Sequence, residues 1–337
     1  MSYRVAINGF GRIGRNYLRA ALERGLLGRS LHVVAINDLW DPATLAHLLE
    51  YDSTFGRLRW NVTHDGESLD VDGHRVHALR EFDPGELPWA DLGVDLVIEA
   101  TGKLRTREEA ARHVKVGSRR VLITAPGKDL DATFVFGVNH HTYDPAQHQI
   151  VSAASCTTNC LAPMVKVLND AFGVVRGYLT TVHAYTNDQV LLDSPHKDRR
   201  RGRSAAVNII PTSTGAARAI GLVLPELAGR LDGVALRVPV EDGSMCDLTC
   251  QLAEPATAQE VNAAFQAAAA TYPDGVLRYT DAPLVSRDIV DDAASCVFDA
   301  GLTRSDGTLA TVFGWYDNEC AYANRLVDLT LMMADQD

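Results

Sequence analysis

The chain has 337 residues, of which 46% are hydrophobic and 22% charged, proportions that exclude a mainly disordered protein. Its 43 acidic residues outnumber its 32 basic ones, so a broad electrostatic surface for nucleic acid or an anionic membrane is not expected. No apolar run approaches the roughly 20 residues that span a bilayer, and the first residues lack the layout of a signal peptide. The six cysteines are too few for a disulfide scaffold, and we expect a cytoplasmic protein without a nucleic-acid or membrane partner.

The first half of the chain alternates strand-like apolar runs with helical stretches, which is typical of a parallel α/β sheet. Strands are predicted over residues 4–8, 31–37, 95–100 and 120–124, and helices over 12–23 and 106–114. The polar, turn-rich region 60–80 is predicted to form an antiparallel insertion.

A glycine motif separates the first predicted strand from the first predicted helix. Gly9, Gly11 and Gly14 form G-x-G-x-x-G, in which glycines permit a tight turn, the approach of a pyrophosphate and close packing of helix on strand. Asp38 ends the second predicted strand 24 residues after Gly14, where its carboxylate would bind a ribose 2′-OH and repel a 2′-phosphate. The motif therefore predicts an NAD site, and the competing interpretation is a glycine turn that binds nothing.

The pattern of predicted elements changes near residues 150–156. A helix is predicted from Cys156 to about residue 172, followed by strands over 177–183, 233–240 and 247–252 and helices over 214–224 and 258–272. We expect a Rossmann dinucleotide-binding α/β domain over residues 1–155, completed by a C-terminal helix over 319–337. Residues 156–318 are expected to form an α+β catalytic domain with a large, mostly antiparallel or mixed sheet.

Cys156 opens a predicted helix in the run SCTTNC, where the helix dipole favours a thiolate. A nucleophilic cysteine needs that stabilisation and a nearby base. His183, at the end of a predicted strand, is the candidate base, with a purely structural role as the alternative for either residue. The other cysteines have no zinc-ligand spacing, so no metal site is expected.

Two further features suggest phosphate binding. Thr214 and Gly215 precede a predicted helix whose N-terminus offers N–H groups to an anion, and Arg237 interrupts an apolar strand. A structural ion pair is the alternative for Arg237. The basic run 197–203 is interpreted as a solvated loop, a subunit contact or the source of a phosphate-binding arginine rather than as a nucleic-acid patch.

Seven motifs make the whole chain resemble the NAD-dependent, phosphorylating glyceraldehyde-3-phosphate dehydrogenases of bacterial type. They are INGFGRIGR at 7–15, AIND at 35–38, YDSTFG at 51–56, SCTTNCLAP at 155–163, PHKDRRRGR at 195–203, PTSTGAA at 211–217 and WYDNE at 315–319. The resemblance implies oxidation of D-glyceraldehyde 3-phosphate to 1,3-bisphosphoglycerate in glycolysis, through a thiohemiacetal and a thioester on Cys156 with His183 as base. It also implies a homotetramer.

The same resemblance implies binding roles for individual residues. NAD would be held by Gly9, Gly11, Arg12, Ile13, Gly14, Asp38, Thr124, Asn318 and Tyr322. The substrate phosphate would be held by Thr186 and Arg237, with Arg203 in the same anionic neighbourhood. Inorganic phosphate, the second substrate, would be held by Ser155, Thr157, Thr214 and Gly215.

A few positions depart from the family pattern. Cys320 and Ala321 replace the usual pair after WYDNE, Leu104 replaces an aromatic residue, and Phe82 replaces an arginine. These changes border the expected cofactor site and leave the reactive groups in place. They raise the hypothesis of an isoenzyme that resists thiol-directed inhibitors.

Three other activities are alternatives to this interpretation. An erythrose-4-phosphate dehydrogenase shares the cysteine and the histidine, and kinetics with the two aldehydes would distinguish it. An aspartate-semialdehyde dehydrogenase lacks the SCTTNC and PTSTG strings found here. A non-catalytic NAD-binding or RNA-binding scaffold is disfavoured by the presence of Cys156 and His183 and by the net charge of −11.

Overall fold

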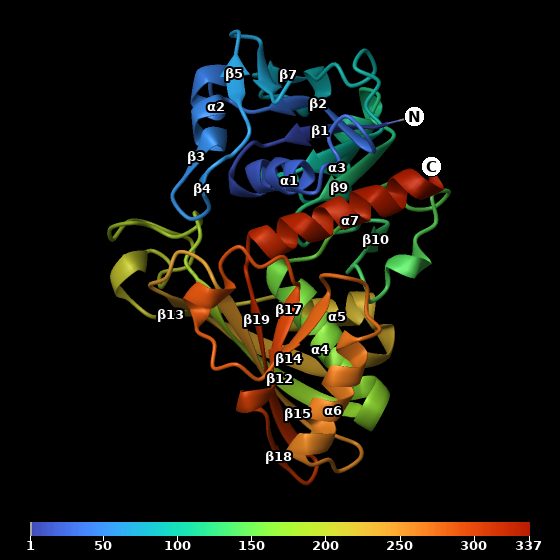
Figure 1. Cartoon of the computed structure of the whole chain (residues 1–337), viewed down its shortest axis with the longest axis vertical. Coiled ribbons are helices and arrows are strands. Elements are labelled where there is room, and N and C mark those ends of the chain that lie inside the picture. Colours follow the sequence, from blue (N-terminus) through green and yellow to red (C-terminus); the bar gives the residue numbers. More distant parts are fainter. Residues whose placement is uncertain (1) are drawn as a thin grey trace. The chain divides into compact units, whose positions relative to one another are not determined.

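The computed structural model describes residues 2–337 and divides into two compact units (Figure 1). The first unit holds the chain up to Phe134, together with His140–Ala154 and Ala323–Asp337. The second unit holds Val135–Asn139 and Ser155–Tyr322. No helix among residues 2–337 is both long and apolar enough to cross a membrane.

The first unit is built on a nine-stranded sheet with the order β10-β11-β9-β8-β1-β2-β7-β6-β5. Its strands are β1 (Tyr3–Asn8), β2 (Leu31–Asn37), β5 (Val62–His64), β6 (Ser68–Val71), β7 (His74–Leu79), β8 (Leu96–Glu99), β9 (Arg120–Ile123), β10 (Ala132–Thr133) and β11 (Ile150–Ser152). Its helices include α1 (Arg12–Glu23), α2 (Pro42–Glu50) and α3 (Arg107–Lys115), and a separate ribbon pairs β3 (Tyr51–Asp52) with β4 (Gly56–Arg57).

Neighbouring strands from β10 to β7 run parallel, and the apolar runs of β1, β2 and β8 reflect burial on both faces of this sheet. The predicted antiparallel insertion is confirmed, because β5, β6 and β7 form an antiparallel meander that joins the sheet beside β2. The carboxyl ends of β1, β2 and β8 therefore meet at one edge, which is where doubly wound sheets bind their ligands.

A chain of buried polar side chains holds that edge together. Glu99 accepts a hydrogen bond from Asn8 at 2.7 Å and lies 3.0 Å from His113 Nε2. Trp89 Nε1 donates to His113 Nδ1 at 3.0 Å, so the neutral ring carries its proton on Nε2 and donates it to Glu99. Asn37 donates to Asn8 at 2.8 Å. Because these buried groups are paired, they fix the ends of three strands relative to one another.

The second unit is built on an eight-stranded sheet with the order β13-β14-β12-β15-β19-β17-β16, and β18 pairs with β19. Its strands are β12 (Val174–Ala184), β13 (Ile210–Ser213), β14 (Leu231–Val238), β15 (Ser244–Leu252), β16 (Leu277–Thr280), β17 (Cys296–Asp299), β18 (Arg304–Asp306) and β19 (Leu309–Tyr316). Helices α4 (Cys156–Phe172), α5 (Ala216–Val223) and α6 (Ala258–Ala269) lie together on one side of it (Figure 1).

The second sheet is mixed, because β12 pairs in parallel with β14, and β16 with β17, while the remaining pairs are antiparallel. Together with the Rossmann sheet of the first unit, it confirms the α/β plus α+β architecture that the sequence predicts. Helix α7 (Cys320–Gln336) confirms the helix expected near residue 319.

The sequence patterns do not predict β19, although it lies in the interior of the second sheet. Its residues alternate between buried and partly exposed, but Gly314 interrupts the run of side chains. An added Cβ at Gly314 would lie 2.6 Å from Met164 Sδ and 2.7 Å from Cys296 Sγ, so the glycine lets α4 pack directly on the strand. Tertiary packing rather than local propensity therefore decides this element.

Asp337 forms hydrogen bonds with residues of two strands of the first sheet, β1 and β9. Tyr3 donates its hydroxyl proton to Asp337 at 2.6 Å, and Arg120 Nε donates to the same carboxylate at 2.7 Å. The Asp337 side chain is only 6% exposed. Although burial opposes it, hydrogen bonds from Arg120 and Tyr3 hold the pKa of Asp337 below its usual value.

We expect Asp337→Asn to lower the free energy of unfolding by about 1–3 kcal/mol at neutral pH, because the buried Tyr3 and the partly exposed Arg120 lose a charged acceptor. Since the folded-state pKa is depressed, the difference between wild type and variant should vanish as the pH falls through that pKa. Urea unfolding at neutral and acidic pH measures both effects. The exposed neighbour Asp335→Asn serves as the matched control, and an equal loss in both variants would contradict the assignment.

Candidate active site

The loop between β1 and α1 has the geometry that a bound dinucleotide requires. Gly9 has a φ of +92°, and an added Cβ would lie 2.6 Å from the backbone nitrogen of Thr101. At Gly14 an added Cβ would lie 2.3 Å from the carbonyl oxygen of Gly9. Gly11, at the N-cap of α1, has open space where a Cβ would stand, so a pyrophosphate can approach the helix N-terminus.

Asp38 follows β2 and contacts this loop directly. Its Oδ2 accepts a hydrogen bond from the backbone N–H of Phe10 at 2.8 Å, and its Oδ1 accepts from that of Leu39 at 2.7 Å. Each carboxylate oxygen keeps acceptor capacity for a ribose hydroxyl, and the negative charge opposes a 2′-phosphate. The residues present therefore fit NAD.

A cavity of about 400 Å³ opens at the carboxyl edge of the first sheet. Gly9, Gly11 and Asp38 line it, together with two exposed aromatic side chains, Trp40 and Phe82. The sequence analysis did not name Trp40 as a site residue. Its position two residues after Asp38 could have suggested it. The cavity has the lining expected of an adenosine site, with flat apolar side chains beside polar groups.

Several residues that the sequence predicts to bind the cofactor do not line this cavity. Arg12 turns its guanidinium to Asp52 in an ion pair, and Ile13 and Thr124 are not among the lining residues. Leu104, one of the departures from the family pattern, does line the cavity.

Cys156 is the first residue of α4, as the sequence predicts. Ser155 caps the helix, because its Oγ accepts a hydrogen bond from the backbone N–H of Thr158 at 3.0 Å. Ala154, just before the cap, has a φ of +58°, a left-handed conformation that residues other than glycine rarely adopt. This strained turn directs the chain abruptly into the helix and presents Cys156 at its N-terminus.

The side chains of Cys156 and His183 are in contact within the second unit. The Sγ atom of Cys156 lies 3.5 Å from Nε2 of His183, which is at the end of β12. The parallel register of β12 and β14 pairs His183 with Arg237, whose Nη1 lies 2.8 Å from His183 Nδ1. The fold thus brings together three predicted residues from distant parts of the sequence.

Two neighbours compete for the Nδ1 atom of His183. The carbonyl oxygen of Ala184, at 2.7 Å, requires a proton on Nδ1, whereas the Arg237 guanidinium requires a lone pair there. Arg237 Nη1 also donates to the Ala184 carbonyl at 2.9 Å. We assign the proton to Nδ1, because Arg237 keeps an acceptor and Nε2 then presents its lone pair to the thiol of Cys156.

Burial opposes a charge on either member of this pair. It raises the pKa of the Cys156 thiol to about 11, and burial together with Arg237 lowers the pKa of His183 to about 3. Desolvation therefore works against the stabilisation that the helix N-terminus gives to a thiolate. The contact of Sγ with Nε2 allows a proton to pass between the two groups.

Tyr316 packs beside His183 and contacts Thr157, the residue after Cys156. Its hydroxyl lies 2.8 Å from Thr157 Oγ1 and 3.0 Å from Thr181 Oγ1, and its ring packs edge-on against His183. The hydroxyl of Thr157, a predicted phosphate ligand, therefore faces Tyr316. The sequence did not single out Tyr316, although it lies in the WYDNE motif.

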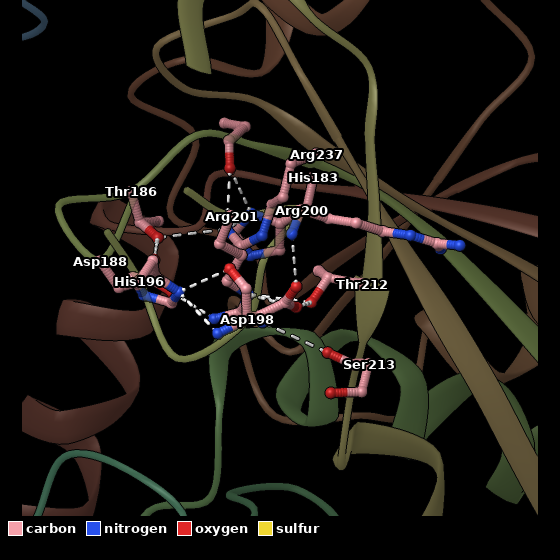
Figure 2. A network of polar contacts seen from close by, with 11 residues as sticks. His183, Thr186, Asp188, His196, Asp198, Arg200, Arg201, Thr212, Ser213 and Arg237 are labelled. Atoms are coloured by element: carbon pink, nitrogen blue, oxygen red, sulfur yellow. Dashed lines mark hydrogen bonds and ion pairs between the residues drawn. The ribbon is translucent and has the colours of Figure 1, made fainter. Parts of the chain in front are cut away.

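A polar network surrounds Arg237 and Thr186 (Figure 2). Thr186 Oγ1 accepts a hydrogen bond from Arg237 Nη1 at 3.3 Å and donates to Asp188. Asp188 forms an ion pair with Arg201. Arg237 Nε is buried and has no hydrogen-bond partner among residues 2–337, which leaves a cationic donor unused.

The predicted phosphate ligand Arg203 lies outside this network. It pairs instead with Asp193 at 2.8 Å, and both side chains are exposed. Arg201, two residues earlier in the same basic run, points into the network and also donates to Thr212 at 2.9 Å. Sequence spacing alone did not distinguish among the closely spaced arginines, because their directions depend on how the loop folds.

The predicted ligands of inorganic phosphate lie at the N-termini of two helices. Ser155 and Thr157 are at the start of α4, and Thr214 and Gly215 immediately precede α5. Thr214 Oγ1 accepts a hydrogen bond from the backbone N–H of Ala216 at 3.2 Å, and Gly215 has open space where a Cβ would stand. The two helices pack against each other.

Asn318 and Tyr322, predicted to line the cofactor, belong to the same unit as Cys156 and are buried. Ser244 Oγ donates to Asn318 Oδ1 at 2.6 Å and accepts from the backbone N–H of Ala184 at 3.1 Å. Tyr322 lies close enough to Cys156 for their charged forms to repel. Among residues 2–337, no cluster of three or more histidine, cysteine or acidic side chains is arranged to hold a metal ion.

Comparison with known protein families accounts for most of the chain. Residues 3–107 match the family described as glyceraldehyde 3-phosphate dehydrogenase, NAD binding domain. Residues 155–318 match the family described as glyceraldehyde 3-phosphate dehydrogenase, C-terminal domain.

Individual relatives are similar over their whole length. Glyceraldehyde-3-phosphate dehydrogenase 2 of Streptomyces avermitilis is 53% identical over 337 residues, which is all of both chains. Glyceraldehyde-3-phosphate dehydrogenase of Streptomyces coelicolor is 55% identical, again over all of both chains. The enzyme of the same name from Mycobacterium avium is 54% identical over 99% of each chain.

We expect His183→Asn to slow alkylation of Cys156 by iodoacetamide about 10- to 100-fold at neutral pH, because the partly exposed thiol must then ionise without a neighbouring base. The deficit should shrink as the pH rises toward about 11, where the thiol ionises on its own. Measured rates across this range test both statements. His196→Asn, a histidine that contacts Asp198, is the matched control, and equal rates in wild type and His183→Asn would overturn the role of His183.

Proposed function

The chain belongs to the glyceraldehyde-3-phosphate dehydrogenase family, and we propose that Cys156 and His183 carry out its reaction. It is an NAD-dependent oxidoreductase of glycolysis that converts D-glyceraldehyde 3-phosphate to 1,3-bisphosphoglycerate. The observation that carries the proposed mechanism is the 3.5 Å approach of Cys156 Sγ to His183 Nε2 in a buried setting.

The first step forms a carbon–sulfur bond. Cys156 Sγ attacks the aldehyde carbon of the substrate while its proton passes to His183 Nε2, and His183 then gives that proton to the former carbonyl oxygen, which leaves a neutral thiohemiacetal and a neutral imidazole. The backbone N–H of Cys156 and the protonated His183 stabilise the developing oxyanion. Pairing the two charges removes most of the penalty that burial places on each one.

The second half of the reaction uses the same base. Bound NAD⁺ would supply the hydride acceptor for the thiohemiacetal carbon. His183 takes the hydroxyl proton of the thiohemiacetal, so a thioester remains on Cys156. An oxygen of inorganic phosphate then attacks the thioester carbonyl. The carbon–sulfur bond breaks, the acyl phosphate leaves, and Cys156 recovers a proton from His183.

We assign the substrate phosphate to Thr186, Arg237 and Arg201. The unused, buried Nε donor of Arg237 supports this choice, as does the ion pair of Arg201 with Asp188, which an anionic substrate can replace. Arg201 takes the place that the sequence suggested for Arg203. Inorganic phosphate is assigned to Ser155, Thr157, Thr214 and Gly215, where two helix N-termini favour an anion.

We assign the cofactor to residues 1–155 completed by 319–337, and the chemistry to residues 156–318. Gly9, Gly11, Gly14 and Asp38 would bind the dinucleotide, which the loop geometry supports. The remaining assigned cofactor residues are Arg12, Ile13, Thr124, Asn318 and Tyr322. The inhibitor-resistance hypothesis, based on Phe82, Leu104, Cys320 and Ala321, stays a prediction.

We further propose a homotetramer in the cytoplasm. Four apolar side chains of residues 190–210 are largely exposed in the single chain: Leu191, Leu192, Val207 and Ile209. An apolar surface of this kind is normally covered in an assembly. Subunit contacts through this segment would cover it.

The function is tested by following NADH formation with glyceraldehyde 3-phosphate, with and without inorganic phosphate. Sustained turnover should require phosphate, prefer NAD⁺ to NADP⁺, and fall at least about a thousandfold in Cys156→Ala. Erythrose 4-phosphate serves as the competing aldehyde. Faster turnover of erythrose 4-phosphate, or NAD binding without any turnover, would contradict the proposed substrate or the enzymatic role.

The assignment of Arg201 is tested against Arg203 as a matched pair from one loop. We expect Arg201→Ala to raise the KM for glyceraldehyde 3-phosphate at least about tenfold, because a cationic donor to the substrate phosphate is lost. Arg203→Ala, which removes a surface ion pair, should change it less than about threefold. Steady-state kinetics gives both values, and the reverse order would restore the original assignment of Arg203.

A further inference from the structure

Two buried carboxyl groups, Asp242 and Asp317, lie beside Asn318 and have no part in the mechanism above. Asp242 is 3% exposed and lies in the loop between β14 and β15, and Asp317 is fully buried just after β19. A buried acidic pair is costly unless a proton or a cation neutralises it.

Burial raises the pKa of Asp317 to about 6, and three backbone donors oppose that shift. Its Oδ1 accepts hydrogen bonds from the backbone N–H groups of Glu319 at 2.8 Å and Cys320 at 2.7 Å. Its Oδ2 accepts from the backbone N–H of Asp291 at 2.8 Å. Three donors stabilise the charged form, and they make Asp317 the centre of the turn that leads into α7.

Asp242 has the opposite surroundings. Its Oδ1 accepts from the backbone N–H of Gly243 at 2.8 Å and from that of Asn318 at 3.3 Å. Its Oδ2 is buried and receives no hydrogen bond from residues 2–337, while the side chain lies in hydrogen-bonding contact with the Asp317 carboxyl group. A proton on Asp242 converts this repulsive contact into an O–H···O⁻ hydrogen bond.

The charged groups around the two carboxyl groups favour the protonated form of Asp242. Glu319 faces Asp242 from the same turn, and Arg287 on the neighbouring segment is paired with Glu241 at the surface. Burial, followed by the charge of Asp317, raises the pKa of Asp242 to about 9. Asp242 is therefore protonated at neutral pH.

The pair acts on Asn318 through two contacts. Asp242 Oδ1 accepts a hydrogen bond from the backbone N–H of Asn318. Ser244 Oγ donates a hydrogen bond to the side-chain oxygen of Asn318 at 2.6 Å. Ser244 Oγ accepts a hydrogen bond from Ala184 N–H and donates its own proton to Asn318 Oδ1, because an amide oxygen can only accept. The carboxamide NH₂ of Asn318 therefore points away from Ser244 and is oriented as a donor.

We propose that protonated Asp242 is a positioning residue for the cofactor: its hydrogen bond to Asp317 holds the turn at residues 317–320 and orients Asn318 toward the nicotinamide carboxamide. This inference rests on the proposed role of Asn318 in binding NAD. It assigns Asp242 no contact with the cofactor itself.

Binding measurements by calorimetry separate positioning from general stability. Asp242→Ala should weaken NAD⁺ binding about tenfold and leave binding of ADP-ribose, which lacks the nicotinamide, within about twofold of wild type. Asp242→Asn, whose amide still donates to Asp317, should bind NAD⁺ within about threefold of wild type at neutral pH. Glu241→Gln, the exposed neighbouring carboxylate, is the matched control and should bind both ligands like wild type.

The pH dependence supplies a second readout. In the wild type, ionisation of Asp242 above about pH 9 should weaken NAD⁺ binding, and Asp242→Asn should abolish this alkaline loss. Because the folded-state pKa is raised, wild-type stability should also decline as the pH rises from about 4 to about 9, more steeply than in Asp242→Asn. Thermal unfolding over the same range measures the second effect.

Asn318→Ala separates failure of this inference from failure of the proposed function. If Asn318→Ala weakens NAD⁺ binding but Asp242→Ala does not, the positioning role of Asp242 is wrong and the cofactor assignment stands. If Asn318→Ala has no effect, the assignment of Asn318 fails, and the positioning role fails with it. Equal weakening of NAD⁺ and ADP-ribose in Asp242→Ala would make Asp242 a general structural residue and would also overturn the inference.

Discussion

The proposed catalytic centre depends on the contact between the partly exposed thiol of Cys156 and the buried imidazole of His183, whose Sγ and Nε2 atoms lie 3.5 Å apart. Desolvation opposes a charge on either group, and the attraction between the two opposite charges offsets part of that cost. The surrounding fold meets this constraint from three directions. Helix α4 begins at Cys156, the register of β12 and β14 sets Arg237 beside the ring, and Tyr316 packs against its edge.

Two arginines of the same unit are stabilised in different ways. Arg201 is neutralised by Asp188, which also accepts a hydrogen bond from Thr186, while Arg237 has backbone and hydroxyl acceptors, and its buried Nε has no hydrogen-bond partner among residues 2–337. A phosphate dianion is a stronger acceptor than these groups are. Under the proposed assignment, substrate binding is an exchange of partners, which limits the cost of holding cations in a partly buried place.

Asp337 and Asp242 show how the surroundings of an aspartate decide whether it is ionised or neutral. Asp337 is an ionised acceptor because Tyr3 and Arg120 donate to it. Burial first, and then the neighbouring carboxylate of Asp317, raise the pKa of Asp242. Burial opposes the charge of both Asp337 and Asp242, and the hydrogen-bond donors around Asp337 reverse that effect.

The sequence by itself determined the two fold classes, the dinucleotide loop and the positions of Cys156 and His183 at the ends of their elements, because those features depend on local periodicity and on residue types with one conformational use. It did not determine β19, whose glycine is explained only by the packing of α4 on it. It also did not separate Arg201 from Arg203 as candidate phosphate ligands, because the direction of a side chain in a loop depends on contacts such as those of Arg201 with Asp188 and Thr212. The raised pKa of Cys156 and the pairing of Asp242 with Asp317 were likewise decided by tertiary structure alone, since desolvation and contact between distant residues exist only once the chain is folded.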